Sequence, residues 1–201
     1  NLCSKQLQEA VNLANQMNKK IYVVLNGYTH EEELQNLPAY LELLEEIKVH
    51  ALIISDIGTM QLAKQLTTRP LHTSTQASVS NFHAAKLWKD AGAKRVVVAR
   101  ECSIKECEEI QKYAQIEVET FTHGAMCVSY SGKCTISNYS SGRDSNRGGC
   151  IQSCRHPFTF ESNETSNSSD NYYLMNAKDL MAVSLIPSFK AANIHSLKIE
   201  G

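Results

Sequence analysis

The sequence predicts an α/β fold, an incomplete or modified TIM-like (β/α) barrel with a cysteine- and glycine-rich insertion. Three observations favour it. Short apolar runs alternate with helical periodicities through residues 4–121, the pattern of βα units with right-handed crossovers. The 201 residues fall short of the roughly 250 of a full eight-stranded barrel. The alternation stops at Gly124, where the composition changes.

Six strands are expected, five before the insertion and one at the end of the sequence. Each is a short apolar run, and the run at 95–99 is nearly continuous, as in a parallel sheet buried on both faces. The expected strands are 21–25, 51–54, 70–73, 95–99, 116–121 and 196–199. Because the sequence starts with a helical pattern and stops at a strand, we expect it to be a piece of a larger chain.

Helices are expected between these strands, and capping residues indicate where several begin. Thr29 and Glu32 have capping-box spacing, and so do Ser103 and Glu106. Pro38 suits a first helical turn better than a helix interior. The expected helices are 4–17 with Ser4 as cap, 38–48, 59–66, 80–92 from Ser80 to Gly92, 103–113, and a last helix from about 177 that Asn176 caps and Pro187 interrupts.

The chain divides into three expected parts. Residues 1–123 form the βα-repeat part of the barrel, residues 124–175 the cysteine-rich insertion with a mobile loop, and residues 176–201 the final helix and strand. The insertion is rich in Ser, Asn, Gly and Cys, and the nearly featureless run 161–171 predicts the mobile loop. So long a stretch without periodicity needs an internal staple or a function.

Composition and charge exclude several classes of protein. With 42% hydrophobic and 20% charged residues, the chain is neither disordered nor a coiled coil. The formal charge of −1 disfavours nucleic-acid binding through bulk charge and leaves a local basic groove for that role. No apolar run approaches the roughly 20 residues of a membrane span, and no signal peptide is visible. The odd number of seven cysteines disfavours a secreted disulfide scaffold, so we expect reduced thiols and a cytoplasmic protein.

Four cysteines within 28 residues are the sharpest chemical feature of the sequence. Six, fifteen and three residues separate them, with glycines around them, and they are Cys127, Cys134, Cys150 and Cys154. Three interpretations remain open on the spacing. The thiols can be buried and free. They can hold a structural zinc, which usually has two close ligand pairs. They can also hold a four-cysteine iron–sulfur cluster, which allows irregular spacing. Three arginines would offset the charge of such a cluster: Arg143, Arg147 and Arg155.

The other three cysteines carry no predicted chemistry. Cys107 shares a helical face with Ile104 and Ile110, which predicts core packing. Cys102 follows a strand end, where a side chain can line a pocket, and Cys3 lies near the start of the sequence.

Polar residues gather just after the predicted strands, where βα barrels hold their working residues. We predict catalytic roles for His123, Arg100, Lys198 and Glu200, and substrate binding by Asn26, Gln76, Arg143 and Arg155. The strand-end rule also selects Asp56, His72 and Glu101. Because the cysteines follow the strand that ends near residue 121, a metal centre would lie at the mouth where substrate binds.

Each of these residues has a plainer alternative. His123 can bond to backbone as a loop histidine instead of donating a proton. Arg100 can pair with Glu101 or Asp56 instead of holding a carboxylate or phosphate. Two further alternatives are structural, an ion pair between Lys198 and Glu200 and a turn role for Gln76.

The run from 119 to 137 resembles the signature of the peptidase U32 family, the collagenase-like peptidases. The family pattern is Glu-x-Phe-x-x-Gly-Ala-apolar-Cys, followed after four residues by Gly-x-Cys-x-apolar-Ser, and this run matches it throughout. Supporting stretches lie at 74–78, 143–155, 176–180 and 196–201, so the resemblance spans nearly the whole chain. The Tyr-Ser-Gly-Lys-Cys run and the segment 143–155 most resemble the branch that makes 5-hydroxyuridine in transfer RNA.

The resemblance implies more than the spacing does. Members look like modified TIM barrels, and better-understood relatives are iron–sulfur proteins that hydroxylate a wobble uridine of transfer RNA, a ribosomal cytidine or ubiquinone precursors. This implies a 4Fe-4S cluster, transfer RNA as a partner on a local basic surface, and prephenate as a co-substrate. Some relatives have a cysteine where this chain has Met181, so Cys154 becomes the expected fourth ligand.

We therefore expect an RNA-hydroxylating enzyme, with two functions as alternatives. One is a collagenase-type peptidase acting on a protein substrate, for which Cys127 and His123 could form a nucleophile and base. Neither His-Glu-x-x-His nor Gly-x-Ser-x-Gly occurs, which disfavours common peptidase chemistry. The other is a structural module that binds zinc. The sequence does not predict an oligomeric state.

Overall fold

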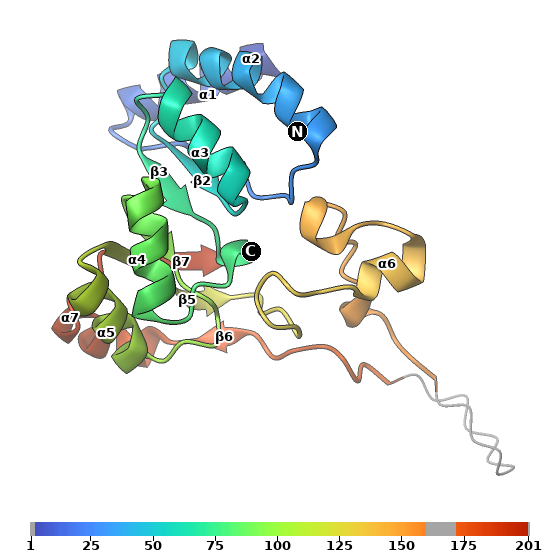
Figure 1. Ribbon diagram of the computed structural model, residues 1–201. Coiled ribbons are helices and arrows are strands. Elements are labelled where there is room, and N and C mark those ends of the chain that lie inside the picture. The colour runs from blue at the N-terminus through green and yellow to red at the C-terminus, as the bar shows by residue number, and fades with distance from the viewer. Residues whose placement is uncertain (1–2, 160–171, 201) are drawn as a thin grey trace, which may run out of the picture.

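A computed structural model describes residues 3–159 and 172–200 of the chain. A mostly parallel sheet curls into half of a barrel, and helices surround it on the outside (Figure 1). The predicted barrel-like α/β fold is confirmed. The loop predicted at 161–171 lies outside the described residues.

The strands and helices follow one another as βα units up to the fifth strand. The strands are β1 Tyr22–Leu25, β2 Ala51–Ile54, β3 Leu71–Thr73, β4 Arg95–Val97, β5 Glu117–Gly124, β6 Leu180–Met181 and β7 Ser196–Glu200. The α-helices are α1 Ser4–Gln16, α2 Glu31–Ile47, α3 Ile57–Leu66, α4 Phe82–Ala91, α5 Ile104–Ala114, α6 Ile136–Ser141 and α7 Ile186–Ala191. Short 3-10 helices are η1 Thr75–Ala77, η2 Ser145–Arg147, η3 Ser153–Arg155 and η4 Val183–Leu185.

The sheet order places the carboxyl ends of the strands along one edge. Strands β1 to β5 pair as parallel neighbours in chain order, and β7 pairs parallel with β5. The short β6 runs antiparallel to the end of β5. Figure 1 shows the insertion with α6 beside this edge, near the carboxyl terminus.

One apolar core lies between the sheet and helices α1 to α5. Strand β2 is buried along its whole length, as its continuous apolar run predicts. The largest fully buried side chains include Leu41, Leu44, Leu52, Ile54 and Ile110. Burial of each such side chain contributes roughly 1.5–3 kcal/mol, so this core supplies the main stabilisation of the half-barrel.

The structure corrects the predicted start of the second helix. Helix α2 begins at Glu31, capped by a reciprocal box between His30 and Glu33, and Pro38 lies in its interior. The prediction of a start at Pro38, and of a cap at Thr29, was wrong. A proline inside a helix costs roughly 3 kcal/mol, and burial of Leu37 and its neighbours on the same face offsets that cost.

The end of the chain also differs from the prediction. In place of a helix from about 177, residues 180–181 form β6, η4 follows, and the helix α7 begins only at Ile186. Pro187 lies in the first turn of α7, where its missing N–H costs little. The backbone of Ala182 bonds to Thr122 on β5, so pairing with the sheet replaces the predicted helical turn.

Two helix caps differ from the prediction by one residue, and two are confirmed. Cys3 and Asn81 cap α1 and α4, where Ser4 and Ser80 were predicted. The Ser103–Glu106 capping box and the end of α4 at Gly92 are as expected. Within the described residues, no helix combines the length and the apolar character needed to cross a bilayer.

Candidate functional site

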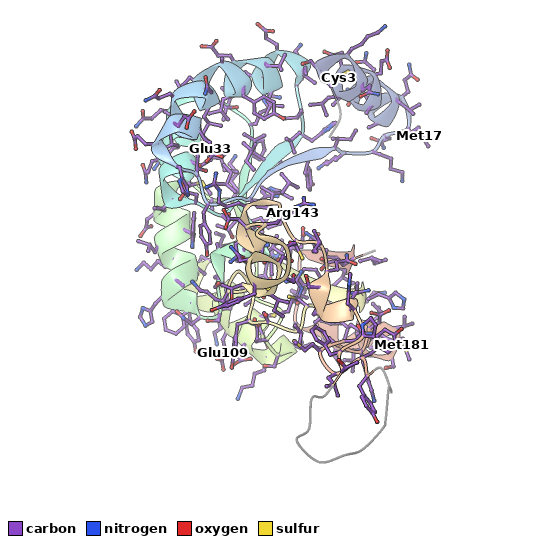
Figure 2. All side chains as sticks on the ribbon, turned by 90° about the vertical axis from the view of Figure 1, so that its right-hand side faces the viewer. Cys3, Met17, Glu33, Glu109, Arg143 and Met181 are labelled. Atoms are coloured by element: carbon purple, nitrogen blue, oxygen red, sulfur yellow. The ribbon has the colours of Figure 1, made fainter. Side chains whose placement is uncertain are left out.

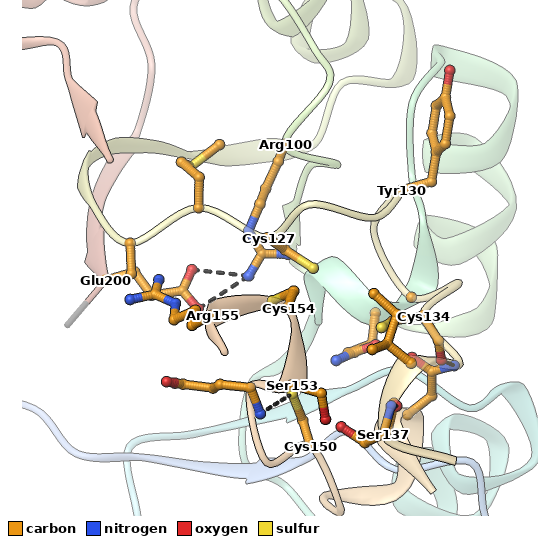
Figure 3. A pocket seen from close by; sticks show the side chains of 18 residues that line it. Arg100, Cys127, Tyr130, Cys134, Ser137, Cys150, Ser153, Cys154, Arg155 and Glu200 are labelled. Atoms are coloured by element: carbon orange, nitrogen blue, oxygen red, sulfur yellow. Dashed lines mark hydrogen bonds and ion pairs between the residues drawn. The ribbon is translucent and has the colours of Figure 1, made fainter. Parts of the chain in front are cut away.

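A cavity of about 270 Å³ lies where the carboxyl ends of the strands meet the insertion (Figure 3). Gln76 after β3, Arg100 after β4 and Glu200 at the end of β7 form one side of its wall. The insertion forms the other side. All four cysteines of the motif line this cavity: Cys127, Cys134, Cys150 and Cys154.

The insertion packs around serines instead of apolar side chains. Across residues 124–158, all of which the structure describes, the buried residues other than glycine are Ser131, Ser137, Ser145 and Ser153. Their hydroxyls are engaged, since Ser137 Oγ accepts the N–H of Ile151 and Ser145 Oγ accepts that of Ser137, both at 3.2 Å. Hydrogen bonds of this kind contribute about 1 kcal/mol each, so this region is held more weakly than the barrel.

A tight turn at residues 130–133 fixes the path of the chain between Cys127 and Cys134. The N–H of Ser131 donates to Glu101 Oε1 at 2.8 Å, and the Tyr28 hydroxyl donates to the carbonyl of Gly132 at 2.9 Å. Gly132 has φ +73°, and a Cβ there would lie 2.2 Å from the carbonyl oxygen of Gln76. Only glycine lets the turn approach the strand end this closely.

Other contacts attach the rest of the insertion to the barrel. Asn146 Nδ2 donates to the carbonyl of Cys134 at 2.9 Å. Arg147 forms an ion pair with Glu33 on α2 at 2.6 Å. At the start of the insertion, the N–H of Ala125 donates to the carbonyl of Glu200 at 3.0 Å. The cysteines are therefore positioned by contacts to several barrel elements.

The seven cysteines, all in described residues, form no disulfide. Burial raises the pKa of the Cys154 thiol, and the neighbouring thiols Cys127, Cys150 and Cys134 raise it further, while Arg155 opposes this shift. The backbone N–H of Gln152 donates to Cys150 Sγ at 3.4 Å. Among residues 3–159 and 172–200, no three His, Cys, Asp or Glu side chains group closely enough to hold one metal ion. The four thiols thus share a cavity without converging on a single point.

The ion pairs of the wall differ from the predicted ones. Arg100 Nη2 contacts both carboxylate oxygens of Glu200, at 2.9 and 3.0 Å, and its guanidinium lies over the Phe121 ring at 4.6 Å. The alternatives that paired Arg100 with Glu101 or Asp56 were wrong, since Asp56 caps α3. Glu200 does not pair with Lys198, whose ammonium lies 5.5 Å from the centre of the Phe121 ring.

The structure places only part of the predicted site at the cavity. Within the described chain, the wall includes Arg100, Glu200, Gln76 and Arg155. The other four residues lie outside it. His123 is exposed on β5, beyond a shift in the pairing register with β7. Asn26 donates a hydrogen bond to Ser74 Oγ at 3.3 Å, and Lys198 lies on β7. Arg143 is exposed on the insertion (Figure 2).

His72 lies elsewhere than the strand-end rule suggests. It is buried in the middle of β3, and its ring meets the Tyr22 ring edge-on, with 5.1 Å between the ring centres. It lines a second cavity near the amino ends of the strands, together with Lys20, Lys94 and Arg95. Burial, and after it the charge of Arg95, lowers the pKa of His72 to about 4. The imidazole is therefore neutral near pH 7, and it does not belong to the cysteine site.

The two interior cysteines of the barrel behave differently from the four at the cavity. Cys107 is fully buried in the core, as predicted. Burial raises the pKa of Cys102 to about 12, which keeps its thiol protonated. A protonated thiol is a poor nucleophile and a poor ligand.

Sequence reasoning missed two kinds of residue at the site. The buried serines are dispersed in a serine-rich segment, and nothing distinguishes them there from exposed serines. Tyr130 lines the cavity although it is an exposed aromatic residue, and Ser131 makes three hydrogen bonds to two barrel loops. The motif contained both residues, but only the folded contacts give them a role.

Comparison with known sequences gives a consistent result. A sequence model described as Peptidase family U32 matches residues 1–201. Among curated proteins, "tRNA hydroxylation protein P1" of Bacillus subtilis (strain 168) is 38% identical, over all of this chain and 49% of that protein. "23S rRNA 5-hydroxycytidine C2501 synthase" of Escherichia coli (strain K12) is 34% identical, over 98% of this chain and 30% of that protein. "Collagenase" of Porphyromonas gingivalis (strain ATCC BAA-308 / W83) is 28% identical, over all of this chain and 51% of that protein.

A solved structure supports the fold. The structure titled "The Structure of the U32 Peptidase Mk0906" matches with a TM-score of 0.53 and 14% identity, over 61% of this chain and 53% of that one. At this identity the likeness concerns the fold alone. The chain spans about half the length of the first curated relatives it matches, 49% of each of the first two.

Proposed function

Because the chain belongs to peptidase family U32, we propose that it is part of an iron–sulfur enzyme that hydroxylates the wobble uridine of transfer RNA. The observation that carries the proposal is the meeting of four cysteines around one cavity at the carboxyl ends of the strands. The names of the relatives from Bacillus subtilis and Escherichia coli support RNA as the substrate. Such a protein would act in the cytoplasm, where transfer RNA is.

The donor set suits an iron–sulfur cluster better than a single zinc ion. The four cysteines would hold such a cluster, which allows irregular ligand spacing along the chain, whereas a structural zinc usually has two close ligand pairs. All four thiols line the same cavity. When bound, such a cluster supplies a centre that can accept and release an electron.

Residues beside the cysteines fit this role. The N–H of Gln152 donates to Cys150 Sγ, and hydrogen bonds to ligand sulfurs tune a cluster. Arg155 lies in the cavity wall, where its charge would offset the charge of thiolates. The serine interior of residues 124–158 also fits, because this described stretch buries no apolar side chain and would gain stability from what it binds.

The charged pair of the wall would serve the substrates. In this proposal Arg100 binds a carboxylate of the co-substrate, which the family resemblance suggests is prephenate, and Glu200 holds the guanidinium in place. Gln76 and Arg155 contact the RNA substrate from the same wall. His123 and Lys198 have no part in it, because they lie outside the cavity.

A collagenase-type peptidase is the second candidate, and the relative from Porphyromonas gingivalis favours it. Its nucleophile and base would be Cys127 and His123. Cys127 lines the cavity, but His123 is exposed outside the cavity wall formed by the described chain. A cysteine nucleophile needs its base within hydrogen-bond reach, so this geometry gives the peptidase less support.

The test uses the full-length protein prepared without oxygen, with iron, sulfide and zinc analysis. We expect iron and sulfide, and 5-hydroxyuridine in transfer RNA from cells that carry the gene. The Cys150→Ala variant should lose both, whereas Cys102→Ala, a cysteine away from the cavity, should keep both. Stoichiometric zinc without iron would overturn the cluster. Collagen cleavage that Cys127→Ala abolishes, in protein without iron, would favour the peptidase.

A further inference from the structure

Tyr130 is an exposed aromatic side chain in the wall of the cysteine cavity. Its exposure is 76%, although it lies beside buried Ser131. Figure 3 shows the ring pointing away from the labelled cysteines, with its hydroxyl at the far end. A single exposed tyrosine needs no explanation, but one at the rim of a candidate active site has a face available to a ligand.

The backbone that carries Tyr130 is held rigidly. Its carbonyl accepts the N–H of Lys133 at 3.0 Å, which closes the turn. Ser131 then makes three bonds to two barrel loops. Its N–H donates to Glu101 and its Oγ accepts from the N–H of Arg100, both after β4, and its carbonyl accepts from the Ser78 hydroxyl after η1. A ring presented on so constrained a turn loses little conformational freedom on binding.

The segment that carries Tyr130 is basic, unlike the chain as a whole. Residues 124–158 carry four lysines and arginines against one acidic residue, while the whole chain has a formal charge of −1. Arg147 is paired with Glu33. The other three, Lys133, Arg143 and Arg155, form no ion pair within the described part of the chain. The positive charge of this segment would attract the phosphates of a polyanion, and the exposed ring offers a face on which a base can stack.

We propose that the Tyr130 ring stacks on an unpaired base of RNA at the rim of the cysteine cavity, with Lys133 and Arg155 beside the phosphates. The inference rests on the proposed function and adds to it the residue that positions the nucleic acid. Single-stranded RNA is recognised by stacking of splayed bases on aromatic side chains, and basic residues supply the contacts to the backbone. A base paired in a duplex is stacked between its neighbours and cannot stack on the Tyr130 ring.

Tyr139 provides a matched control. It lies on α6 in the same insertion, and at 93% its side chain is even more exposed, but it is not part of the cavity wall. Because both rings are in solvent, removal of either should change thermal stability little. A difference between them in RNA binding therefore reports position at the cavity and not exposure.

The experiment measures binding of a fluorescein-labelled anticodon stem-loop RNA to the full-length holoprotein by anisotropy at fixed salt. Tyr130→Ala should raise the Kd about ten-fold, since stacking of one base accounts for a change of this order. Tyr130→Phe and Tyr130→Trp keep a stacking face and should bind within about two-fold of the unaltered protein, and so should Tyr139→Ala. A duplex RNA of the same composition should bind more weakly and should not distinguish the variants.

The outcomes separate the two proposals. If the unaltered protein binds the stem-loop and Tyr130→Ala binds it equally well, the stacking role is wrong while the proposed function stands. An equal loss in Tyr130→Ala and Tyr139→Ala would also overturn it. Absence of RNA binding by the unaltered holoprotein would overturn both proposals. If Tyr130→Ala lost binding to denatured collagen but kept RNA binding, the stacking role would be wrong and the Tyr130 surface would bind a protein substrate.

Discussion

The half-barrel and the insertion are stabilised in different ways. Residues 3–123 bury leucine, isoleucine and valine side chains between sheet and helices, whereas residues 124–158 bury only serines and glycine. The first region owes its stability to apolar burial, which needs no partner. The second depends on individual hydrogen bonds to the barrel and on close approaches at glycines.

This difference concerns function as well as stability. A region held by separate hydrogen bonds opens locally at low cost, and anything bound between its cysteines would stabilise it by mass action. The barrel presents fixed strand ends, and the insertion brings thiols and basic residues to them. Three perturbations test this division, and the largest expected effect is in the barrel.

A Leu44→Ala substitution removes a fully buried side chain from the core. We expect a loss of roughly 2–5 kcal/mol in the free energy of unfolding, measured by urea denaturation, because a cavity remains in place of the side chain. Leu87→Ala, at an exposed leucine on α4, should stay within about 0.5 kcal/mol of the unaltered protein. Equal losses in the two variants would contradict the stated core.

Acid should destabilise the barrel through His72 before it protonates most carboxylates. The pKa of His72 is lowered to about 4 in the folded chain, with Arg95, Lys20, Glu117 and Glu119 as the charges that act on it. The unfolded chain therefore binds the proton more readily. Stability is complete above about pH 6.5 and falls by on the order of 3 kcal/mol as the pH drops toward 4.

The measurement is the midpoint of urea unfolding between pH 7 and pH 4.5. His72→Gln should flatten the profile over this range, whereas His83→Gln, at an exposed histidine, should leave it unchanged. A profile that stays steep in His72→Gln would place the responsible group elsewhere. Glu45 is not a competitor in this window, because hydrogen bonds from Thr67, Thr68 and Arg69 outweigh burial and lower its pKa to about 2.

The smallest expected effect isolates the turn that carries Tyr130. Gly132 and Gly142 both have positive φ, but a Cβ at Gly132 meets the Gln76 carbonyl at 2.2 Å, whereas a Cβ at Gly142 meets nothing within 4 Å. Both alanine variants bear the strain of the backbone, and Gly132→Ala adds overpacking worth about 1–3 kcal/mol. We expect faster amide exchange and proteolysis of the insertion in Gly132→Ala, with the barrel core still protected. Equal effects in both variants would mean that the close approach is unimportant.

Most of the barrel follows from local patterns. The run at 51–54 becomes a buried parallel strand, the run at 95–99 forms a shorter one at Arg95–Val97, and the Ser103–Glu106 spacing becomes a capping box. Errors occur where tertiary contacts override a local rule. Pro38 stays inside α2 because the leucines of that helix are buried, and residues 180–181 form a strand because β5 offers an edge to pair with.

The spacing of the four cysteines and the glycines around them singled out the thiols that line the cavity, because both are local properties of the chain, and the family resemblance added Cys154 as the expected fourth ligand. Which charged residues surround those thiols is a different matter. Arg100 and Glu200 are a hundred positions apart, and their ion pair exists because parallel strands end along the same edge. Likewise, the family resemblance includes Tyr130 and not Tyr139, but it does not place the ring at the cavity rim, since that position depends on hydrogen bonds from the neighbouring Ser131 to two distant loops.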